Sequence, residues 1–207
     1  MTQLVLNNAE QRITRMLEGD DILSEGHRGF LQSIREYCRA KGGLTNGQEA
    51  HLVRLEEKYQ PDNVEKRKVW VAEYDDEKKN IARICALYYK RTEYFSNLVE
   101  RVLNDSDYVP SEKQYNSMCG NKYAKKVLES TFAEPKYPVG TFVSPRASAS
   151  WRLRHASGDS PCMVIATDVA PVESAAKGSK RYHVLPIGSS DIVEAEERTL
   201  KKARVPK

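Results

Sequence analysis

The chain has 207 residues and a formal net charge of +4, with 40% hydrophobic and 30% charged residues. This composition is ordinary for a globular protein, and the length allows one good core or two small ones. No apolar run approaches the roughly 18–20 residues that span a bilayer, and the N-terminal segment lacks the basic start and apolar stretch of a secretory signal. We therefore expect a cytoplasmic protein with no membrane segment.

The chemical character of the chain changes near Pro135. Residues 1–135 carry 21 Lys or Arg against 22 Asp or Glu, whereas residues 136–207 carry 12 against 7. The first part is typical of helices, and the second of short strands separated by Gly, Pro and Ser, so the predicted fold class is α+β. We expect a helical domain over residues 1–134 and a basic β domain over residues 135–207.

Three helices are predicted before the longest periodic stretch of the sequence. The first covers residues 3–18, the second runs from about 26 to 40, and the third follows Thr45 and reaches Tyr59. Thr45 and Gln48 have the spacing of a capping box, in which the hydroxyl accepts from a helical N–H and the amide returns to the cap. The sequence therefore predicts that a helix begins directly after Thr45.

The longest periodic stretch runs from about residue 64 to residue 103. Apolar residues recur there every seven positions, which favours one long central helix, or two collinear helices with a bend near Arg91 and Thr92. We interpret this stripe as a backbone on which the other helices pack, and the alternative is a coiled coil that makes the protein an oligomer. The series consists of Tyr74, Ile81, Tyr88, Phe95 and Val102.

The capped pattern returns after this stretch. Ser111 and Gln114 repeat the spacing of Thr45 and Gln48, so the helix-turn-helix hairpin is either duplicated or similar by chance, since capping boxes are common. The two units resemble short helical-hairpin segments of bacteriophage DNA-processing proteins, over about 30 residues in each copy. Each is preceded by an aromatic residue and then Ile or Leu, namely Phe30 and Ile34 in the first, Phe95 and Leu98 in the second.

Short strands are predicted after the linker at residue 135. Residues 145–161 lack apolar alternation and predict a long loop with at most one short strand, and the final segment EERTLKKAR predicts a short helix or an edge strand. Short strands with large loops favour a small, strongly bent barrel. The predicted strands cover residues 139–144, 162–167, 180–187 and 192–195.

The order of these motifs resembles the small barrels of the Tudor, KOW and SH3-like group. The resemblance covers residues 137–204 and rests on VGTFV, CMVIATD, RYHVLPIG and IVEAEERTL, with the glycines that they contain. It implies an SH3-like small β-barrel, and a function among nucleic-acid readers, methyl-lysine or methyl-arginine readers, and peptide binders. A methyl-reader cage needs several converging aromatic rings, and the few in this segment argue against it.

Basic and aromatic side chains concentrate in the predicted loop 145–161. Arginine can pair with phosphates while an exposed indole stacks on an unpaired base, and basic residues of the next loop extend the positive charge. The alternative is that Trp151 covers the barrel or the domain interface while its charged neighbours are merely solvated. The candidate nucleic-acid-binding residues are Arg146, Trp151, Arg152, Arg154, His155, Lys177, Lys180 and Arg181.

Sequence motifs of catalysis and metal binding are missing. The chain holds no glycine-rich phosphate loop, HExxH or GxSxG, and its histidines form no convincing triad. Its four cysteines are scattered with no CxxC pair, which favours buried free thiols over a zinc site. We therefore expect neither an enzyme nor a bound cofactor or metal.

These observations favour a nucleic-acid-binding accessory protein of viral or bacterial replication, transcription or repair. No helix carries the clustered Arg, Asn and Gln face of a recognition helix, so single-stranded or irregular nucleic acid is the expected ligand. The rival hypothesis is a protein-interaction adaptor whose barrel docks on a polymerase or another enzyme. The modest net charge of +4 keeps this rival open.

Overall fold

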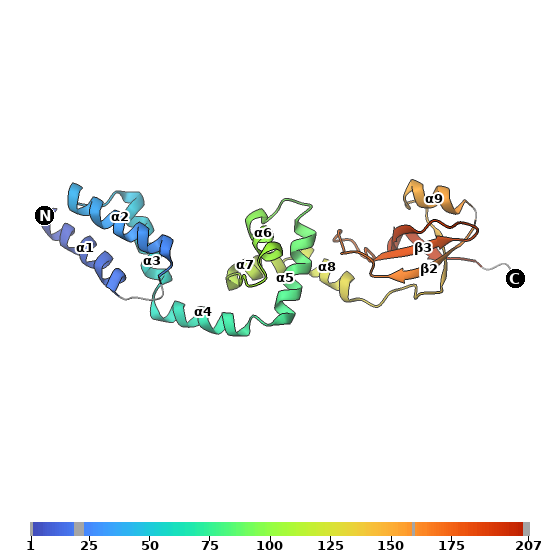
Figure 1. The fold of residues 1–207 in the computed structure, drawn as a ribbon, viewed down its shortest axis with the longest axis horizontal. Helices are drawn as coiled ribbons and strands as arrows, with labels where there is room; N and C mark the ends of the chain where they lie inside the picture. Colours follow the sequence, from blue (N-terminus) through green and yellow to red (C-terminus); the bar gives the residue numbers. More distant parts are fainter. Residues whose placement is uncertain (1, 19–22, 159, 205–207) are drawn as a thin grey trace. The chain divides into compact units, whose positions relative to one another are not determined.

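The computed structural model describes residues 2–18, 23–158 and 160–204, and it confirms the α+β class (Figure 1). The chain divides into two compact units, Met1–Glu73 and Tyr74–Lys207. The domain boundary predicted near residue 135 lies inside the second unit. A division into two domains at this point stays a prediction. Within the described ranges, no helix is both long and apolar enough to cross a membrane.

The described residues of the first unit form four helices, α1 (Thr2–Glu18), α2 (Glu25–Lys41), α3 (Asn46–Lys58) and α4 (Pro61–Glu73). Leu31 and Ile34 of α2 pack with Ile13 of α1 and with Leu52 and Leu55 of α3 in one apolar cluster. Helical spacing places these apolar residues on one face of each helix, and their burial holds the three helices together.

The predicted capping box at the start of α3 is confirmed. The N–H of Gln48 donates to the Thr45 hydroxyl oxygen at 3.2 Å, and the N–H of Thr45 donates to the Gln48 amide oxygen at 2.9 Å. Arg12 of α1 adds a polar tie to this helix, because its guanidinium donates to Glu56 at 2.8 Å and to Glu49 at 2.5 Å. These hydrogen bonds raise the pKa of Arg12 and fix α1 against α3.

The prediction of one long central helix over residues 64–103 is wrong. The stretch is divided among α4, α5 (Asp76–Tyr89) and α6 (Ser96–Asn104). Asp75 begins α5 by accepting the N–H of Lys78 at 2.9 Å, and Glu93 and Phe95 have the left-handed φ values of 58° and 59° that end regular helix. Local capping therefore prevails over the seven-residue repeat, and the coiled-coil alternative loses the helix on which it depended.

The apolar stripe of that stretch still packs, but from separate helices. Tyr74, Ile81, Tyr88 and Val102 are half-buried against the second apolar cluster, whereas Phe95 is 38% exposed. The centre of this cluster is formed by fully buried residues of α5, α7 (Glu112–Cys119) and α8 (Lys122–Phe132). These residues are Ala82, Cys85, Ala86, Met118 and Ala124.

The second capping box is also confirmed, at the start of α7. The N–H of Gln114 donates to the Ser111 hydroxyl oxygen at 3.3 Å, and the N–H of Ser111 donates to the Gln114 amide oxygen at 2.9 Å. This hairpin differs from the first because α7 ends at Cys119 and α8 starts a new helix. Gly120 stands at the break, where a Cβ atom would lie 2.6 Å from the carbonyl oxygen of Asn116.

Asn121 joins three helices at this break. Its Oδ1 accepts the Tyr89 hydroxyl of α5 at 2.8 Å and two backbone N–H groups of α8, while its Nδ2 donates to two carbonyls at the end of α7. One amide thus satisfies backbone groups at both helix termini, which would otherwise lack partners. The backbone partners are Tyr123, Ala124, Ser117 and Met118.

We expect Asn121→Ala to lower the free energy of unfolding by about 1–3 kcal/mol, because the helix cap and the partner of Tyr89 are lost together. Urea unfolding followed by circular dichroism measures this change. The matched control is Asn104→Ala at the exposed end of α6, which should stay within about 0.5 kcal/mol of the wild type. Equal stability of both variants would contradict the role of Asn121.

The C-terminal part forms one antiparallel sheet of five strands in the order β4-β3-β2-β1-β5. Alternate residues of each strand face an apolar core that includes Val143, Val164, Tyr182 and Leu200. Burial of one face is the reason for this alternation. The strands are β1 (Phe142–Pro145), β2 (Cys162–Thr167), β3 (Arg181–Pro186), β4 (Val193–Glu196) and β5 (Leu200–Lys202).

The sheet corrects two further predictions. The strands β4 and β5 lie at opposite edges of the sheet, so the predicted barrel is not closed in the described residues. The predicted loop 145–161 contains a helix, α9 (Trp151–Ser157), which the search for strand alternation did not detect. The last segment forms both predicted alternatives, a 3-10 turn over Glu197–Thr199 and then the edge strand β5.

Candidate functional site

The helix α9 packs with its inner face on the sheet, mainly against β1 and β4. Ser150 begins the helix because its hydroxyl oxygen accepts the N–H of Leu153 at 3.2 Å. Leu153 is fully buried in the sheet core, and Ala156 packs against the same core. The opposite face of α9 is therefore turned outwards, and four of the predicted site residues lie on it: Trp151, Arg152, Arg154 and His155.

Trp151 is the most exposed large hydrophobic residue described, with 70% of its surface open to solvent. Its indole stacks on the imidazole of His155, with 4.8 Å between ring centroids and 13° between the ring planes. The two rings are four residues apart and therefore neighbours on the helix surface. The stack holds the indole in place, and the exposure of Trp151 leaves ring surface open to a ligand.

Three arginines accompany the stacked rings. The Nε of Arg146 donates to the carbonyl oxygen of Leu200 at 2.8 Å, which ties this residue to β5, and the Nε of Arg154 donates to Ala149 at 3.2 Å. A guanidinium has five N–H donors, so most remain available for phosphate oxygens. In the described part of the chain, none of Arg146, Arg152 and Arg154 forms an ion pair with an acidic side chain.

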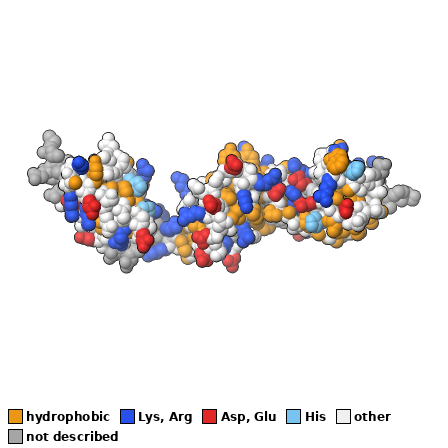
Figure 2. All heavy atoms as spheres, turned by 45° about the horizontal axis from the view of Figure 1, so that its top comes forward, with side chains coloured by type: hydrophobic (Ala, Val, Ile, Leu, Met, Phe, Trp, Pro, Cys, Tyr) orange, Lys and Arg blue, Asp and Glu red, His pale blue; other side chains and the backbone are white. Residues whose placement is uncertain are grey.

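We name the residues Arg146, Trp151, Arg152, Arg154 and His155 the α9 surface. On the face drawn in Figure 2, hydrophobic side chains reach the surface beside a histidine and Lys or Arg side chains over this part of the molecule. The arrangement combines a π-surface with uncompensated positive charge. Such a surface can stack on a planar ring and pair with an anionic group.

The other predicted site residues are not brought to α9. Lys180 has only 5% of its side chain exposed, forms an ion pair with Asp168, and donates to the carbonyl oxygen of Thr131 in α8 at 3.0 Å. Lys177 is exposed and lines a cavity of about 270 Å³ together with residues of α8 such as Lys126. The loop before β3 therefore contacts the helices, and its lysines do not extend the α9 surface.

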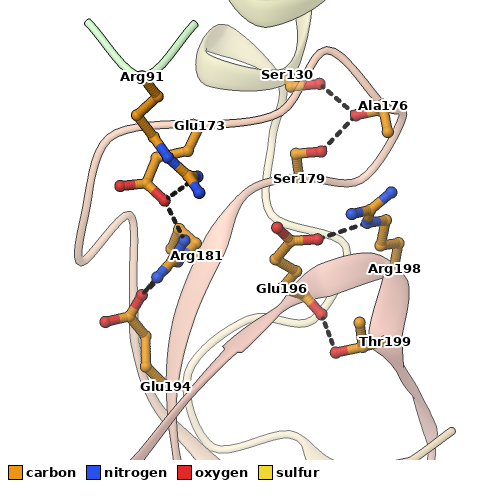
Figure 3. Close-up of polar contacts among 10 residues, drawn as sticks. All are labelled: Arg91, Ser130, Glu173, Ala176, Ser179, Arg181, Glu194, Glu196, Arg198 and Thr199. Atoms are coloured by element: carbon orange, nitrogen blue, oxygen red, sulfur yellow. Dashed lines mark hydrogen bonds and ion pairs between the residues drawn. The ribbon is translucent and has the colours of Figure 1, made fainter. Parts of the chain in front are cut away.

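Arg181 is also engaged inside the molecule. Its guanidinium pairs with Glu194 and with Glu173 at 3.0 Å, and Glu173 pairs in turn with Arg91 at 2.7 Å (Figure 3). The neighbouring carboxylates raise the pKa of Arg181 against the opposing effect of its burial. This chain of charges links β3 and β4 with the turn after α5, so most of the charge of Arg181 is neutralised by its own unit.

Lys201 and Lys202 are basic residues near α9 that the sequence analysis did not include. Both are exposed on β5, and Lys201 lies opposite Ser144 in the β1–β5 register, two residues before Arg146. The sequence signal for β5 is only three residues long, and the pairing with β1 comes from the tertiary structure. These lysines add positive charge beside Arg146.

The described residues offer little for covalent or metal chemistry. All four cysteines are free and buried, as predicted. Burial raises the pKa of the Cys38 and Cys162 thiols, and a hydrogen bond with Cys85 together with burial raises that of Cys119, which keeps these thiols protonated. Across the described ranges, no group of three or more His, Cys, Asp or Glu side chains is placed to hold a metal ion.

Comparison with known proteins yields no relative of this chain. No protein-family model, no curated protein and no solved structure matches it.

We expect Lys180→Ala to lower the free energy of unfolding by about 1–3 kcal/mol. The substitution removes the hydrogen-bond donor to the carbonyl oxygen of Thr131 and the buried methylene groups of the lysine side chain. Lys177→Ala is the matched control, and it should change the free energy of unfolding by less than about 0.5 kcal/mol because Lys177 is exposed. Denaturant unfolding of both variants separates the two roles. Equal midpoints would contradict the internal role of Lys180.

Proposed function

We propose that this chain is a non-enzymatic nucleic-acid-binding accessory protein that contacts single-stranded or irregular nucleic acid through the α9 surface. The observation that carries the proposal is Trp151, which is 70% exposed on a capped helix beside three arginines without ion pairs in the described residues. A base stacks on the indole while the arginines take the phosphates on either side.

The shape of the site favours unpaired bases over a duplex. The helix α9 has seven residues and is packed on the sheet along its inner face, so it offers too short an outer face to follow a major groove. A flat ring at the surface instead suits a base that is already unstacked. The stack on His155 holds the indole before the ligand arrives, which lowers the entropic cost of binding.

We also propose that the sheet belongs to the SH3-like small barrels. The strand order and the 3-10 turn between β4 and β5 agree with an SH3-like small barrel whose side between β4 and β5 is open. Small barrels of this kind serve as scaffolds for several classes of ligand, so the fold does not identify the ligand. The chemistry of the α9 surface is what favours nucleic acid. A role in viral or bacterial replication, transcription or repair, in the cytoplasm, is part of the same proposal.

The rival function is a protein-interaction adaptor that docks on a polymerase or another enzyme. Trp and Arg are the residues most enriched in the energetic centres of protein interfaces, so the α9 surface has a composition that suits this role too. Exposed Phe142 on β1, with 40% of its surface open, adds apolar area to the β part. The following two measurements decide between the two functions.

We expect Trp151→Ala to weaken binding of the full chain to a labelled oligothymidylate by roughly 5- to 150-fold, which corresponds to about 1–3 kcal/mol for one stacked base. Fluorescence anisotropy at low salt measures the affinity. Phe132→Ala removes another exposed ring, 61% open, and serves as the control that should bind normally. Both variants should keep the wild-type melting temperature. If the wild type binds no nucleic acid at low salt, the adaptor function takes its place.

The combined substitution Arg152→Ala and Arg154→Ala should reduce the slope of log K against log[salt] by roughly 1–2 units, because fewer counterions are released on binding. The slope is obtained from titrations of the same oligothymidylate over a range of salt concentrations. Lys66→Ala with Arg67→Ala, on exposed positions of α4, removes the same charge and should leave the slope unchanged. Equal losses in the two double variants would mean that binding follows overall charge and not the α9 surface.

A further inference from the structure

The two capped hairpins can be compared position by position. The first hairpin is α2–α3 and the second is α6–α7, and each begins its later helix with a capping box closed by Gln48 or Gln114. His51 and Ser117 occupy the same place, three residues after this glutamine. The comparison therefore shows where an imidazole in one hairpin is replaced by a small hydroxyl in the other.

Each hairpin also has an aromatic residue near this place, although the two rings stand at different points of their helices. Phe30 lies within α2, whereas Phe95 directly precedes α6 with a left-handed φ of 59°. In the first hairpin, His51 covers Phe30, with 4.3 Å between ring centroids and 38° between ring planes. The ring of Phe30 in the first hairpin is thus covered by an imidazole, which is itself exposed.

The aromatic ring of the second hairpin is partly open to solvent. Phe95 is 38% exposed, and its ring touches Tyr89 edge-on with 5.0 Å between centroids. A groove of about 520 Å³ lies beside it, a volume within the range of small-ligand sites. We name it the Phe95 groove, and its lining consists of Phe95, Ser96, Asn97, Leu98, Lys113, Gln114 and Ser117.

The chemistry of the Phe95 groove is that of a nucleotide site. It offers an aromatic ring for stacking, the amide of Asn97 for hydrogen bonds to a base edge, and Lys113 for a phosphate. Lys113 is the one charged residue of the lining, so the groove favours a ligand that carries negative charge.

We propose that the Phe95 groove binds one nucleotide of single-stranded nucleic acid, with the base against Phe95 and the phosphate at Lys113. The ligand class rests on the proposed function, whereas the groove is formed by other residues than the α9 surface. The protein then holds a strand at two separate places. A strand held in this way gains affinity from the second contact without a change in the first.

The test places an imidazole in the groove at Ser117, which stands as far after Gln114 as His51 stands after Gln48. Ser117→His in the full chain should lower the affinity for oligothymidylate by roughly 5- to 150-fold, the range for one lost stacked base, while Ser117→Ala should bind as the wild type does. Phe95→Leu removes the ring without adding bulk and should lower the affinity in the same range. Lys113→Gln should reduce the salt slope by roughly 1 unit. Circular dichroism checks that each variant keeps its fold.

Amide resonances separate this inference from the proposed function. With oligothymidylate added, signals of residues 95–98 should shift in the wild type and in Trp151→Ala, and should not shift in Ser117→His. Shifts confined to α9 overturn the inference and leave the proposed function standing. Shifts confined to the groove overturn binding at the α9 surface and leave the inference standing. Absence of shifts at both places overturns both. Unchanged affinity of Ser117→His and Phe95→Leu overturns the inference.

Discussion

The burial of Leu153 in the sheet core is the contact on which the α9 surface depends. This side chain is fully buried beneath α9, and the capped start of the helix at Ser150 fixes the direction in which the following residues point. Because a helix turns by about 100° per residue, Trp151 lies about 200° around the helix from the buried Leu153, on the face turned away from the core. Trp151 is exposed for this reason, and the exposure does not follow from its own chemistry, which favours burial.

Side-chain caps determine where several helices of the chain begin. Asp75, Thr45, Ser111 and Asn121 each supply an oxygen to the first free N–H groups of a helix, and these residues decide where α5, α3, α7 and α8 begin. The break before α6 places Phe95 at the edge of the second hairpin, partly exposed. The Phe95 groove is thus a consequence of helix boundaries together with the small side chain of Ser117.

The basic residues of the C-terminal part fall into two groups, those that pair with acidic side chains and those that do not. Lys180 pairs with Asp168, and Arg181 pairs with Glu173 and Glu194. The sheet is linked to the helices of its own unit because Lys180 also donates to Thr131 of α8 and Glu173 also pairs with Arg91, a pair that Figure 3 draws. The arginines of the α9 surface have no such partners in the described residues, and they remain available to a ligand. Net charge alone gives the same weight to both groups, although only the first is neutralised by acidic side chains in the described residues.

The α+β class, the capping boxes and the approximate positions of the strands could be predicted from the amino-acid sequence, because they depend on residues close together in the chain. Seven-residue periodicity failed over residues 64–103, since a repeat of apolar residues does not record a cap such as Asp75. Alternation failed to find α9, which is too short for a periodic signal. The tertiary structure alone decided that Lys180 is buried, that β5 lies beside β1, and that Ser117 leaves a groove open, because each of these depends on contacts between residues distant in sequence.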